Sequence, residues 1–567
     1  MADIAISRPA APVRQRIGAE GWVRVAFLCL IGLFLVAALL LPLYVMLSKS
    51  VQDKSGAYIG LANYLAYFQT PALARSVVNS LTISIVSSVI TIVLAFAYAF
   101  ALTRACVPFK GLFKAIALLP LLAPSLLPGI SLVYLFGNQG FLKSWMMGGS
   151  IYGPLGIVIG EVFFCFPHAF LIILTALSLA DARLYEAAEA LRASRWRIFF
   201  TVTLPGAKVG LISACFVVFT MVITDFGVPK VIGGQYNVLA TDVYKQVIGQ
   251  QNFQMGAVVS VILLLPAILA FAVDRWVQRR QIAILSARAV PYEAKPLFRR
   301  DLAATLYCTF VGILIVGKLG VAGFASVATY WPYNLAPTLK NYDFDRAFDG
   351  GWGAYFNSIE MSALTAVFGT IVVFAGAYLV EKSRGFGPLR LGIHMLAMLP
   401  MAVPGLVLGL AYIFFFNEPA NPLNFLYQSM AILVICTIVH FYTVAHLTAL
   451  TALKQLDAEF ESVSASLKVP FYRTFWRVTV PVCLPAILDI SVYLFVNAMT
   501  TVSAVVFIYS VNTQLASIAV LNMDDAGDVA PAAAMAMMIV GTSAGLRLLH
   551  WLATRGLSRR TQAWRHR

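Results

Sequence analysis

Long stretches of apolar residues, each about 20 residues in length or more, alternate with polar connectors along the whole chain. Each stretch is continuously apolar and does not alternate between apolar and polar positions, so the pattern predicts helices and not the strands of a membrane barrel. The predicted spans cover residues 24–48, 77–103, 112–136, 152–179, 206–228, 256–274, 303–325, 356–380, 391–415, 428–452, 482–508 and 529–551. We therefore expect an all-α polytopic membrane protein with about 12 transmembrane helices.

Charges between the spans predict the orientation of the chain. Basic residues collect in alternate connectors, such as Arg104 after the second span and Arg192 after the fourth. The intervening connectors hold acidic residues, among them Asp343 and Asp524. Because basic connectors stay on the cytoplasmic side, both termini are predicted to be cytoplasmic.

The second half of the sequence repeats the first. The segment "VVNSLTISIV" around Asn79 matches "YFNSIEMSAL" around Asn357, and "LLPLLAPSLLPG" matches "MLPMAVPGLVLG". The offset stays at about 280 residues, which indicates an internal duplication into two parallel six-span repeats. The predicted parts are an N-terminal segment (1–23), a first six-span domain (24–280), a connector (281–302), a second six-span domain (303–552) and a basic tail (553–567).

Composition and charge agree with a membrane protein. Hydrophobic residues make up 60% of the 567 residues and charged residues only 12%, about half of what a soluble protein carries. The net charge of +16 follows from the basic connectors, and no basic stripe interleaved with aromatic residues predicts nucleic-acid binding. The seven cysteines are scattered without a CxxC pair, so neither a metal site nor a cofactor is expected.

One cytoplasmic connector in each half carries a motif. The first reads "YEAAEALRASRWRIFFTVTLPGA" from Tyr185 to Ala207, and the second reads "DAEFESVSASLKVPFYRTFWRVTVPV" from Asp457 to Val482. These segments resemble the EAA loop of ABC-transporter permeases of the type I importer class. The resemblance covers nearly the whole chain, as two fused permease domains. The alternative is a solvated connector that is basic only because it lies on the cytoplasmic side.

The resemblance implies partners and docking residues. A short helix in each loop would dock on one of two copies of an ABC ATPase subunit, and a periplasmic substrate-binding protein would deliver the solute to a permease in a bacterial inner membrane. The implied docking residues are Glu186, Ala187, Ala188, Glu189, Ala193 and Ser194 in the first loop, and Glu461, Ser462, Val463, Ser464 and Lys468 in the second.

The loops depart from the family pattern in two ways. Arg192 and Lys468 stand where the family has glycine, so we expect a differently shaped turn. The second copy also replaces the alanines with Ser462 and Val463, and its nearest acid, Glu461, is displaced by one position. We therefore expect the two loops to contribute unequally to docking.

The sequence argues against ATP hydrolysis by this chain. "GILIVGKL" from Gly312 to Leu319 fits part of a P-loop pattern, but Leu319 stands where a serine or threonine should hold magnesium. The rival classes are an ion-coupled secondary transporter, against which the paired loops argue, and a membrane-embedded enzyme, for which no catalytic cluster is visible.

Polar and helix-breaking residues within the spans are candidates for the translocation path. These candidates are Asn79, Asn357, Glu161, Asp225, Pro124 and Pro404. Each has a structural alternative: helix capping for the asparagines, a hydrogen bond between helices for Glu161, a helix end for Asp225, and a static kink for the prolines.

The substrate is predicted from resemblance alone. The fused layout, "DFGVP" at Asp225 and "TYWPYNLAPTLKNYDF" from Thr329 are similar to permeases for 2-aminoethylphosphonate. Fused permeases for ferric iron share this layout and are the alternative.

Overall fold

The structure, a computed structural model, describes residues 19–281, 290, 292–383, 385–457 and 459–561. Eight helices are long and apolar enough to cross a membrane, and four further pairs of helices qualify when each bent pair is taken as one span. The predicted all-helical membrane fold is confirmed. Apart from the helices, the described residues form a two-stranded hairpin and one isolated bridge between Gln52 and Tyr58.

The first half contains α1 to α13. Their bounds are α1 (Ala19–Leu35), α2 (Leu41–Ser50), α3 (Ala62–Gln69), α4 (Pro71–Arg104), α5 (Lys110–Leu118), α6 (Leu126–Phe136), α7 (Pro154–Ser178), α8 (Ala182–Ala190), α9 (Arg195–Ile198), α10 (Leu204–Thr224), α11 (Gly227–Ile232), α12 (Leu239–Tyr244) and α13 (Phe253–Gln281). π-Helical turns at Val36–Leu40, Phe199–Thr203 and Lys245–Gly249 and 3-10 turns at Leu119–Leu122 and Lys143–Met146 complete it.

The second half contains α14 to α26 and the hairpin. The bounds are α14 (Phe298–Val327), β1 (Ala328–Tyr330), β2 (Asn334–Pro337), α15 (Phe344–Ala347), α16 (Gly351–Lys382), α17 (Gly387–Met398), α18 (Gly405–Phe416), α19 (Met430–His440), α20 (Tyr442–Lys454), α21 (Glu459–Ser466), α22 (Phe471–Thr474), α23 (Val480–Val482), α24 (Leu484–Thr500), α25 (Ala516–Ala526) and α26 (Val529–Thr561). A π-helical turn at Phe475–Thr479 and 3-10 turns at Lys340–Tyr342, Leu399–Ala402, Asn424–Leu426 and Val511–Thr513 complete it.

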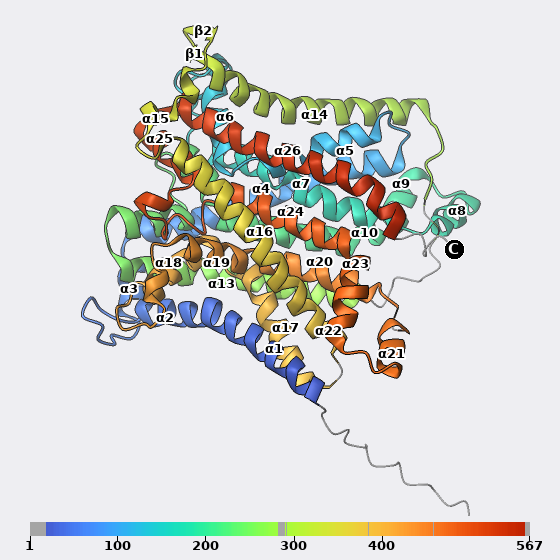
Figure 1. Cartoon of the computed structure of the whole chain (residues 1–567). Coiled ribbons are helices and arrows are strands. Elements are labelled where there is room, and N and C mark those ends of the chain that lie inside the picture. Colours follow the sequence, from blue (N-terminus) through green and yellow to red (C-terminus); the bar gives the residue numbers. More distant parts are fainter. Residues whose placement is uncertain (1–18, 282–289, 291, 384, 458, 562–567) are drawn as a thin grey trace, which may run out of the picture.

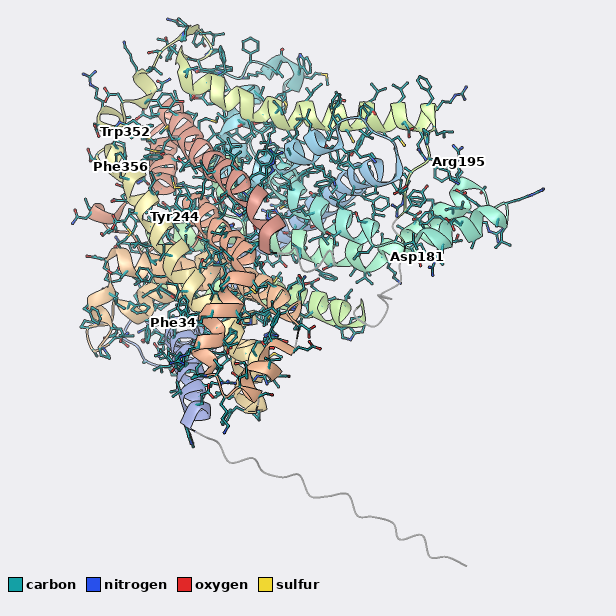
Figure 2. All side chains as sticks on the ribbon, turned by 45° about the vertical axis from the view of Figure 1, so that its right-hand side comes forward. Phe34, Asp181, Arg195, Tyr244, Trp352 and Phe356 are labelled. Carbon is teal, nitrogen blue, oxygen red and sulfur yellow. The ribbon has the colours of Figure 1, made fainter. Side chains whose placement is uncertain are left out.

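The bundle has two ends that differ in the elements they carry (Figure 1). We call the end with α8, α9, α21 and α22 the basic end, and the end with β1, β2, α3 and α25 the hairpin end. The spans run between these two ends. In Figure 2, Asp181 and Arg195 lie at the basic end, whereas Trp352 and Phe356 lie at the opposite end.

The third span of each half is sharply broken. The axis turns by 100° between α5 and α6 and by 112° between α17 and α18. Ala123 and Val403, which precede Pro124 and Pro404, both have extended backbone (φ −100°), as the residue before a proline prefers. The prolines therefore end one helical segment before the next begins, and the chain breaks where the sequence placed a kink or a hinge.

The first spans of the two halves are exchanged. Helices α1 and α2 pack on α16, α17 and α18 of the second half, and α14 packs on α4, α5 and α6 of the first (Figure 1). A tyrosine hydroxyl fixes each contact: Tyr412 donates to the Ala38 carbonyl (2.7 Å) and Tyr307 donates to the Leu94 carbonyl (2.9 Å). Each sequence repeat is therefore completed by a helix of the other repeat.

The same set of side-chain hydrogen bonds follows the first span in both halves. Asn63 donates to the carbonyl groups of Ser50 and Gln52, and Asn341 donates to those of Ser326 and Ala328. The next residue in each copy is a tyrosine whose hydroxyl bonds the serine side chain. The repeated Asn-Tyr dipeptide thus closes the turn at the hairpin end of each first span.

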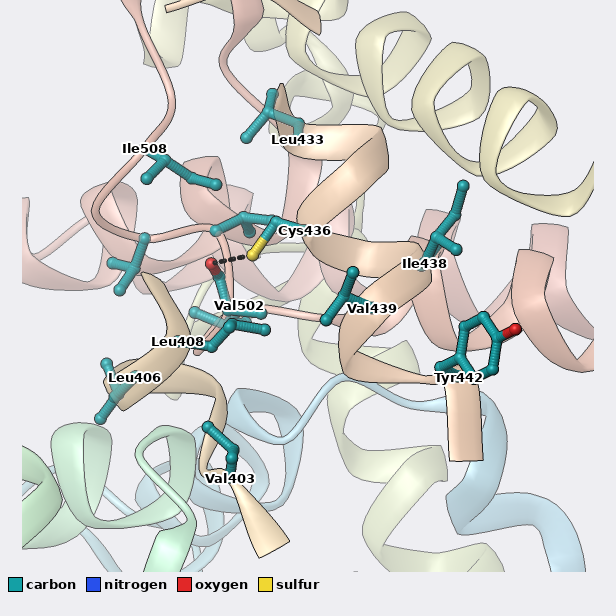
Figure 3. Packing of buried hydrophobic residues seen from close by; sticks show 14 of the residues in the cluster. Val403, Leu406, Leu408, Leu433, Cys436, Ile438, Val439, Tyr442, Val502 and Ile508 are labelled. Carbon is teal, nitrogen blue, oxygen red and sulfur yellow. Dashed lines mark hydrogen bonds between the residues drawn. The ribbon is translucent and has the colours of Figure 1, made fainter. Parts of the chain in front are cut away.

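The buried core continues through the broken span of the second half. Figure 3 shows side chains of α18, α19 and the segment 502–508 packed together, with Cys436 pointing at this segment. The Cys436 thiol donates to the Ala504 carbonyl (3.4 Å). A Cβ atom on Gly409 would lie 2.9 Å from the same carbonyl oxygen, so glycine permits the close approach of α18 to this segment.

Tyr412→Phe should lower stability by about 1–3 kcal/mol, because the buried Ala38 carbonyl would lose its partner in a π turn where the helical ladder is interrupted. The measurement is thermal unfolding of the purified chain in detergent. Tyr333→Phe, at a residue with 72% exposure, is the matched control and should leave the melting temperature unchanged. Equal melting temperatures for the two variants would contradict a structural role for this hydrogen bond.

Candidate functional site

The first motif loop forms a helix, α8, that begins at a defined cap. The Asp181 carboxylate accepts from the Arg183 N–H (3.1 Å), as an N-cap does, and from the Val290 N–H (3.3 Å). Glu186, Ala187 and Glu189 are exposed on this helix. The loop therefore presents its two acids and a small residue on an open face at the basic end.

The turn after the helix is left-handed in both halves. Arg192 has φ of 53° and Lys468 has φ of 51°. The Ala193 N–H donates to Ala188 O and the Val469 N–H donates to Ser464 O, both at 3.0 Å, which completes a Schellman motif in each loop. The expectation of a differently shaped turn is wrong. The backbone keeps the geometry that favours glycine, at a cost of about 1 kcal/mol for each basic residue.

The remaining residues of the first loop bridge α8 to the next helix. Ala193 is half-buried, and the Ser194 hydroxyl accepts from the Arg197 N–H (3.3 Å) as the N-cap of α9. In the second loop Pro470 takes this capping position, and the Phe471 N–H instead donates to the Glu20 carboxylate of α1. The two loops are thus capped by different means.

Arg104 joins the first loop to the membrane spans. Its guanidinium is buried and donates to the Leu177 carbonyl (2.9 Å) and to the Tyr185 hydroxyl (3.2 Å). Tyr185 in turn donates to Thr203 (3.1 Å) in the turn that leads into α10. These hydrogen bonds therefore link α8 directly to the ends of α4, α7 and α10.

Lys382 occupies the position of Arg104 in the second half and pairs with Glu461 (3.1 Å). Counted from the left-handed turns at Arg192 and Lys468, Glu461 matches Tyr185 and not Glu186. This explains the displaced acid in the sequence: it replaces the tyrosine as the partner of the basic residue at the end of the second span. Its side chain is only 20% exposed.

The second loop has no acid at the positions that match Glu186 and Glu189 of the first loop. Ser462 and Val463 correspond to Glu186 and Ala187 and are exposed. Ser464 corresponds to Ala188, and its hydroxyl bonds Thr474. Lys468 is exposed, as Arg192 is. The two loops therefore place their exposed acids differently, since the acid that α21 exposes is Glu459, at its first residue.

A cavity of about 400 Å³ lies between the two halves. It reaches from Asp225, at the end of α10, to Asp274, close to the basic end of α13, and Pro404 contributes to the opposite wall. Pro124 is not among the lining residues, although its neighbours Ala123 and Ser125 are. Its polar lining residues are Ser125, His168, Thr220, Thr224, Asp225, Asp274, His440, Thr443, Tyr493, Asn497, Thr500, Thr501 and Ser503. None of the described lining residues is a lysine or an arginine.

Asp225 and Glu161 meet behind the cavity wall. Asp225 accepts from the Val228 N–H (2.9 Å) at the start of α11, so it also ends one helix and begins another. Glu161 on α7 is fully buried, and its carboxyl group lies within hydrogen-bonding reach of Asp225. Only Asp225 of this pair lines the cavity.

Asn79 and Asn357 lie near the hairpin end and are not among the residues that line the cavity. Asn79 donates to the Asn237 carbonyl (2.9 Å) and Asn357 donates to the Gln514 carbonyl (3.0 Å). The following serines, Ser80 and Ser358, accept from the first N–H of α12 and α25, at 2.7 Å in both halves. The repeated Asn-Ser pair therefore holds α12 and α25 in place.

Two contacts join the halves on the hairpin side of the cavity. Lys230 on α11 pairs with Asp525 on α25 (2.9 Å), and Tyr244 stacks on Phe507 with ring centroids 6.2 Å apart. Sequence reasoning missed both contacts. At the offset that aligns Asp225 with its counterpart Thr501, Lys230 matches Val506. A charge that the second copy lacks could have signalled that this position matters, without revealing its partner.

The described residues include no group of three or more His, Cys, Asp or Glu side chains that could hold a metal ion. The P-loop-like segment lies within the continuous helix α14, where the Lys318 amine is 4.4 Å from the centroid of the Phe163 ring. A phosphate-binding loop requires a strand, an open loop and a helix, which α14 does not provide.

Comparisons with known proteins agree with this architecture. Residues 92–283 and 369–559 each match the family described as "Binding-protein-dependent transport system inner membrane component". The ferric transport system permease FbpB of Actinobacillus pleuropneumoniae is 28% identical over 462 residues, which cover 77% of this chain and 65% of the relative. A putative ferric transport permease, FbpB 1 of Haemophilus influenzae, is 28% identical over 71% of this chain and 65% of its own length.

A shorter match is the molybdenum transport permease ModB of Escherichia coli K12, 33% identical over 22% of this chain and 56% of its own length. The chain thus spans 65% of the length of the two FbpB relatives.

The two family matches start 277 residues apart, in keeping with the duplication (369 − 92). As an ABC permease component the chain is not itself an ATPase. It belongs, as a fusion of two copies, to the binding-protein-dependent transport system inner membrane components.

Proposed function

We propose that the chain is the permease of a ferric-iron importer in a bacterial inner membrane. The names of the two FbpB relatives support iron as cargo. The cavity supports a cation, because Asp225 and Asp274 line it and no lysine or arginine does among the described residues. A phosphonate dianion would meet no positive charge on this path, and none of the relatives named above is named for phosphonates. Iron is therefore preferred over 2-aminoethylphosphonate.

In this proposal the basic end is cytoplasmic, together with both termini, and the hairpin end faces the periplasm. Two ATPase subunits dock on α8 and α21, and a substrate-binding protein docks on the hairpin end. The cavity extends toward the basic end and is closed on the hairpin side by Lys230, Asp525, Tyr244 and Phe507. ATP binding would close the docking helices and open the hairpin side.

The cargo is tested by reconstituting the chain with its ATPase and binding protein in vesicles. ATP-dependent uptake of radioactive iron should be stimulated by iron-loaded binding protein, and 2-aminoethylphosphonate should produce no uptake. Asp225→Asn should lower iron uptake by about tenfold, because a charged group facing the cation is lost. Glu360→Gln, at an exposed acid of α16 that does not line the cavity, is the control. Uptake of 2-aminoethylphosphonate without iron uptake would overturn the proposed cargo.

The docking loops should differ in sensitivity to a bulky charge. Ala188→Arg is expected to lower transport by about tenfold, and Ser464→Arg by less, because the first loop presents Glu186 and Glu189 whereas the matching positions of the second, 462 and 465, hold no acid. Ala553→Arg, at an exposed alanine of α26 outside both loops, controls for the introduced charge. Transport and ATPase pull-down are measured on each variant. Equal losses of transport in the two variants would contradict the unequal contribution of the two loops to docking.

The ion pair between Lys230 and Asp525 should stabilise the conformation in which the periplasmic side is closed. Lys230→Glu should raise ATP hydrolysis in the absence of binding protein by up to about fivefold, since a partly exposed pair is worth about 1 kcal/mol at most and repulsion replaces it. Combining Lys230→Glu with Asp525→Lys should restore the low rate, whereas Lys340→Glu at the same end should have no effect. If the effects of the two changes on ATP hydrolysis simply added, the ion pair would not stabilise the closed conformation.

A further inference from the structure

A second cavity lies apart from the path between the halves. It has a volume of about 350 Å³ and is built only from the first half, at the hairpin end. Its walls come from the start of α4, from α12 and from the following turn up to Met255. This size falls within the range of about 300–1,000 Å³ in which proteins bind small molecules.

The floor of this cavity is a buried carboxylate. Asp242 is 2% exposed, and its Oδ2 atom has no hydrogen-bond partner among the described residues. Among the described residues, the Ser76 hydroxyl lies within hydrogen-bonding reach of this carboxylate. Asp242 lies on α12, between the fifth and sixth spans, and burial raises its pKa to about 6, although Ser76 and Lys245 lower it. A buried carboxylate with a free oxygen has unused capacity to accept a hydrogen bond from a cation.

The rim of the cavity carries the opposite charge. Lys245 is exposed at the edge, where its amine bonds the Asn237 side chain. Gln246, which is 5% exposed, lies on the floor beside Asp242, and Gln250 and Asn252 add amides to the wall. The cavity thus offers an acceptor for a cation at depth and a donor for an anion at its mouth.

The fold itself does not require these polar residues. The first N–H groups of α12 and α25, at Leu239 and Ala516, make the same bond to Ser80 and Ser358, which aligns the two helices. In this alignment Ala519 stands at the position of Asp242, and Met523 at that of Gln246, and both are buried. The second half therefore builds the same helix with apolar side chains.

From this arrangement we infer that the pocket at Asp242 and Lys245 binds a small zwitterion of amino-acid type, with its ammonium group on Asp242 and its acidic group on Lys245. The two opposite charges, placed at different depths, exclude a simple amine or a simple acid as the preferred ligand. This site is separate from the path between the halves, so it does not depend on the identity of the cargo.

Binding at this pocket would affect the conformation of the transporter. Helix α12 carries Asp242 and also Tyr244, which stacks on Phe507 of the other half. A ligand that holds α12 in place stabilises the arrangement in which this contact is closed. The zwitterion is therefore a regulator of the closed hairpin side and not a transported solute.

The test uses the full chain purified in detergent, with glycine, β-alanine and 4-aminobutyrate as probes, and with butylamine and butyrate as single-charge controls. At least one of the three zwitterions should raise the melting temperature and release heat in calorimetry at concentrations up to about 10 mM, whereas the single-charge compounds should not. No response to any zwitterion, or an equal response to butylamine alone, would overturn the inference.

Variants locate the site. Asp242→Asn should weaken binding by about tenfold or more, because a charge-assisted hydrogen bond is lost. Ala72→Trp should block the cavity at its rim without changing its charge, and it keeps the test valid if Asp242→Asn does not fold. Lys245→Gln should also weaken binding, and Lys143→Gln, at an exposed lysine of the same end, is the matched control. Unchanged affinity in Asp242→Asn and Ala72→Trp would place the ligand elsewhere and refute the assignment.

Discussion

Inside a bilayer, each backbone group that a helix break sets free needs a partner within the protein, and the architecture of this chain depends on that requirement. The third spans are broken beside Pro124 and Pro404, yet the chain crosses the bundle there. A neighbouring helix provides one partner at the second break, where Thr443 donates to the Ala397 carbonyl (2.8 Å). Cys436 plays the same part for the Ala504 carbonyl (3.4 Å), in the non-helical segment after α24. Non-helical backbone is therefore tolerated where a neighbouring side chain bonds it, and the cavity is lined by both broken segments and by residues 501–503.

The duplication preserves backbone positions more strictly than side-chain chemistry. Asn79 and Ser80 make the same bonds as Asn357 and Ser358, because α12 and α25 must be held at the same place in both halves. Where the halves face different neighbours, the chemistry differs. Arg104 bonds a tyrosine whereas Lys382 pairs with Glu461. Lys230 forms an ion pair with the other half, whereas the matching residue, Val506, is apolar and buried. A symmetric scaffold therefore carries two unlike sets of contacts.

The sequence predicted the spans, their repeat and the motif loops, because these follow from apolar length and from fixed spacing. The exchange of the first spans was not predictable in this way: an apolar helix reveals that it is buried but not which helix covers it. The inward orientation of Glu461 was missed for a related reason. The left-handed turn at Lys468 determines which way Glu461 faces, and the positions of charges along the sequence do not show where this turn lies. Asn79 and Asn357 were weighed as path residues, whereas their side chains bond loops at the hairpin end.

The two halves also differ in how a displacement of a loop reaches the cavity. In the first half, one helical unit from Arg195 to Thr224 runs from the loop to Asp225 without a sharp bend, a length of about 45 Å at 1.5 Å per residue. In the second half, the equivalent unit turns by 77° at Cys483, between α23 and α24. A rigid rod transmits both translation and rotation to its far end, whereas a bent one converts part of a push into a change of angle. The same closing motion of two partner subunits would therefore move Asp225 and the matching wall at Thr501 by different amounts, and the cavity would open unevenly.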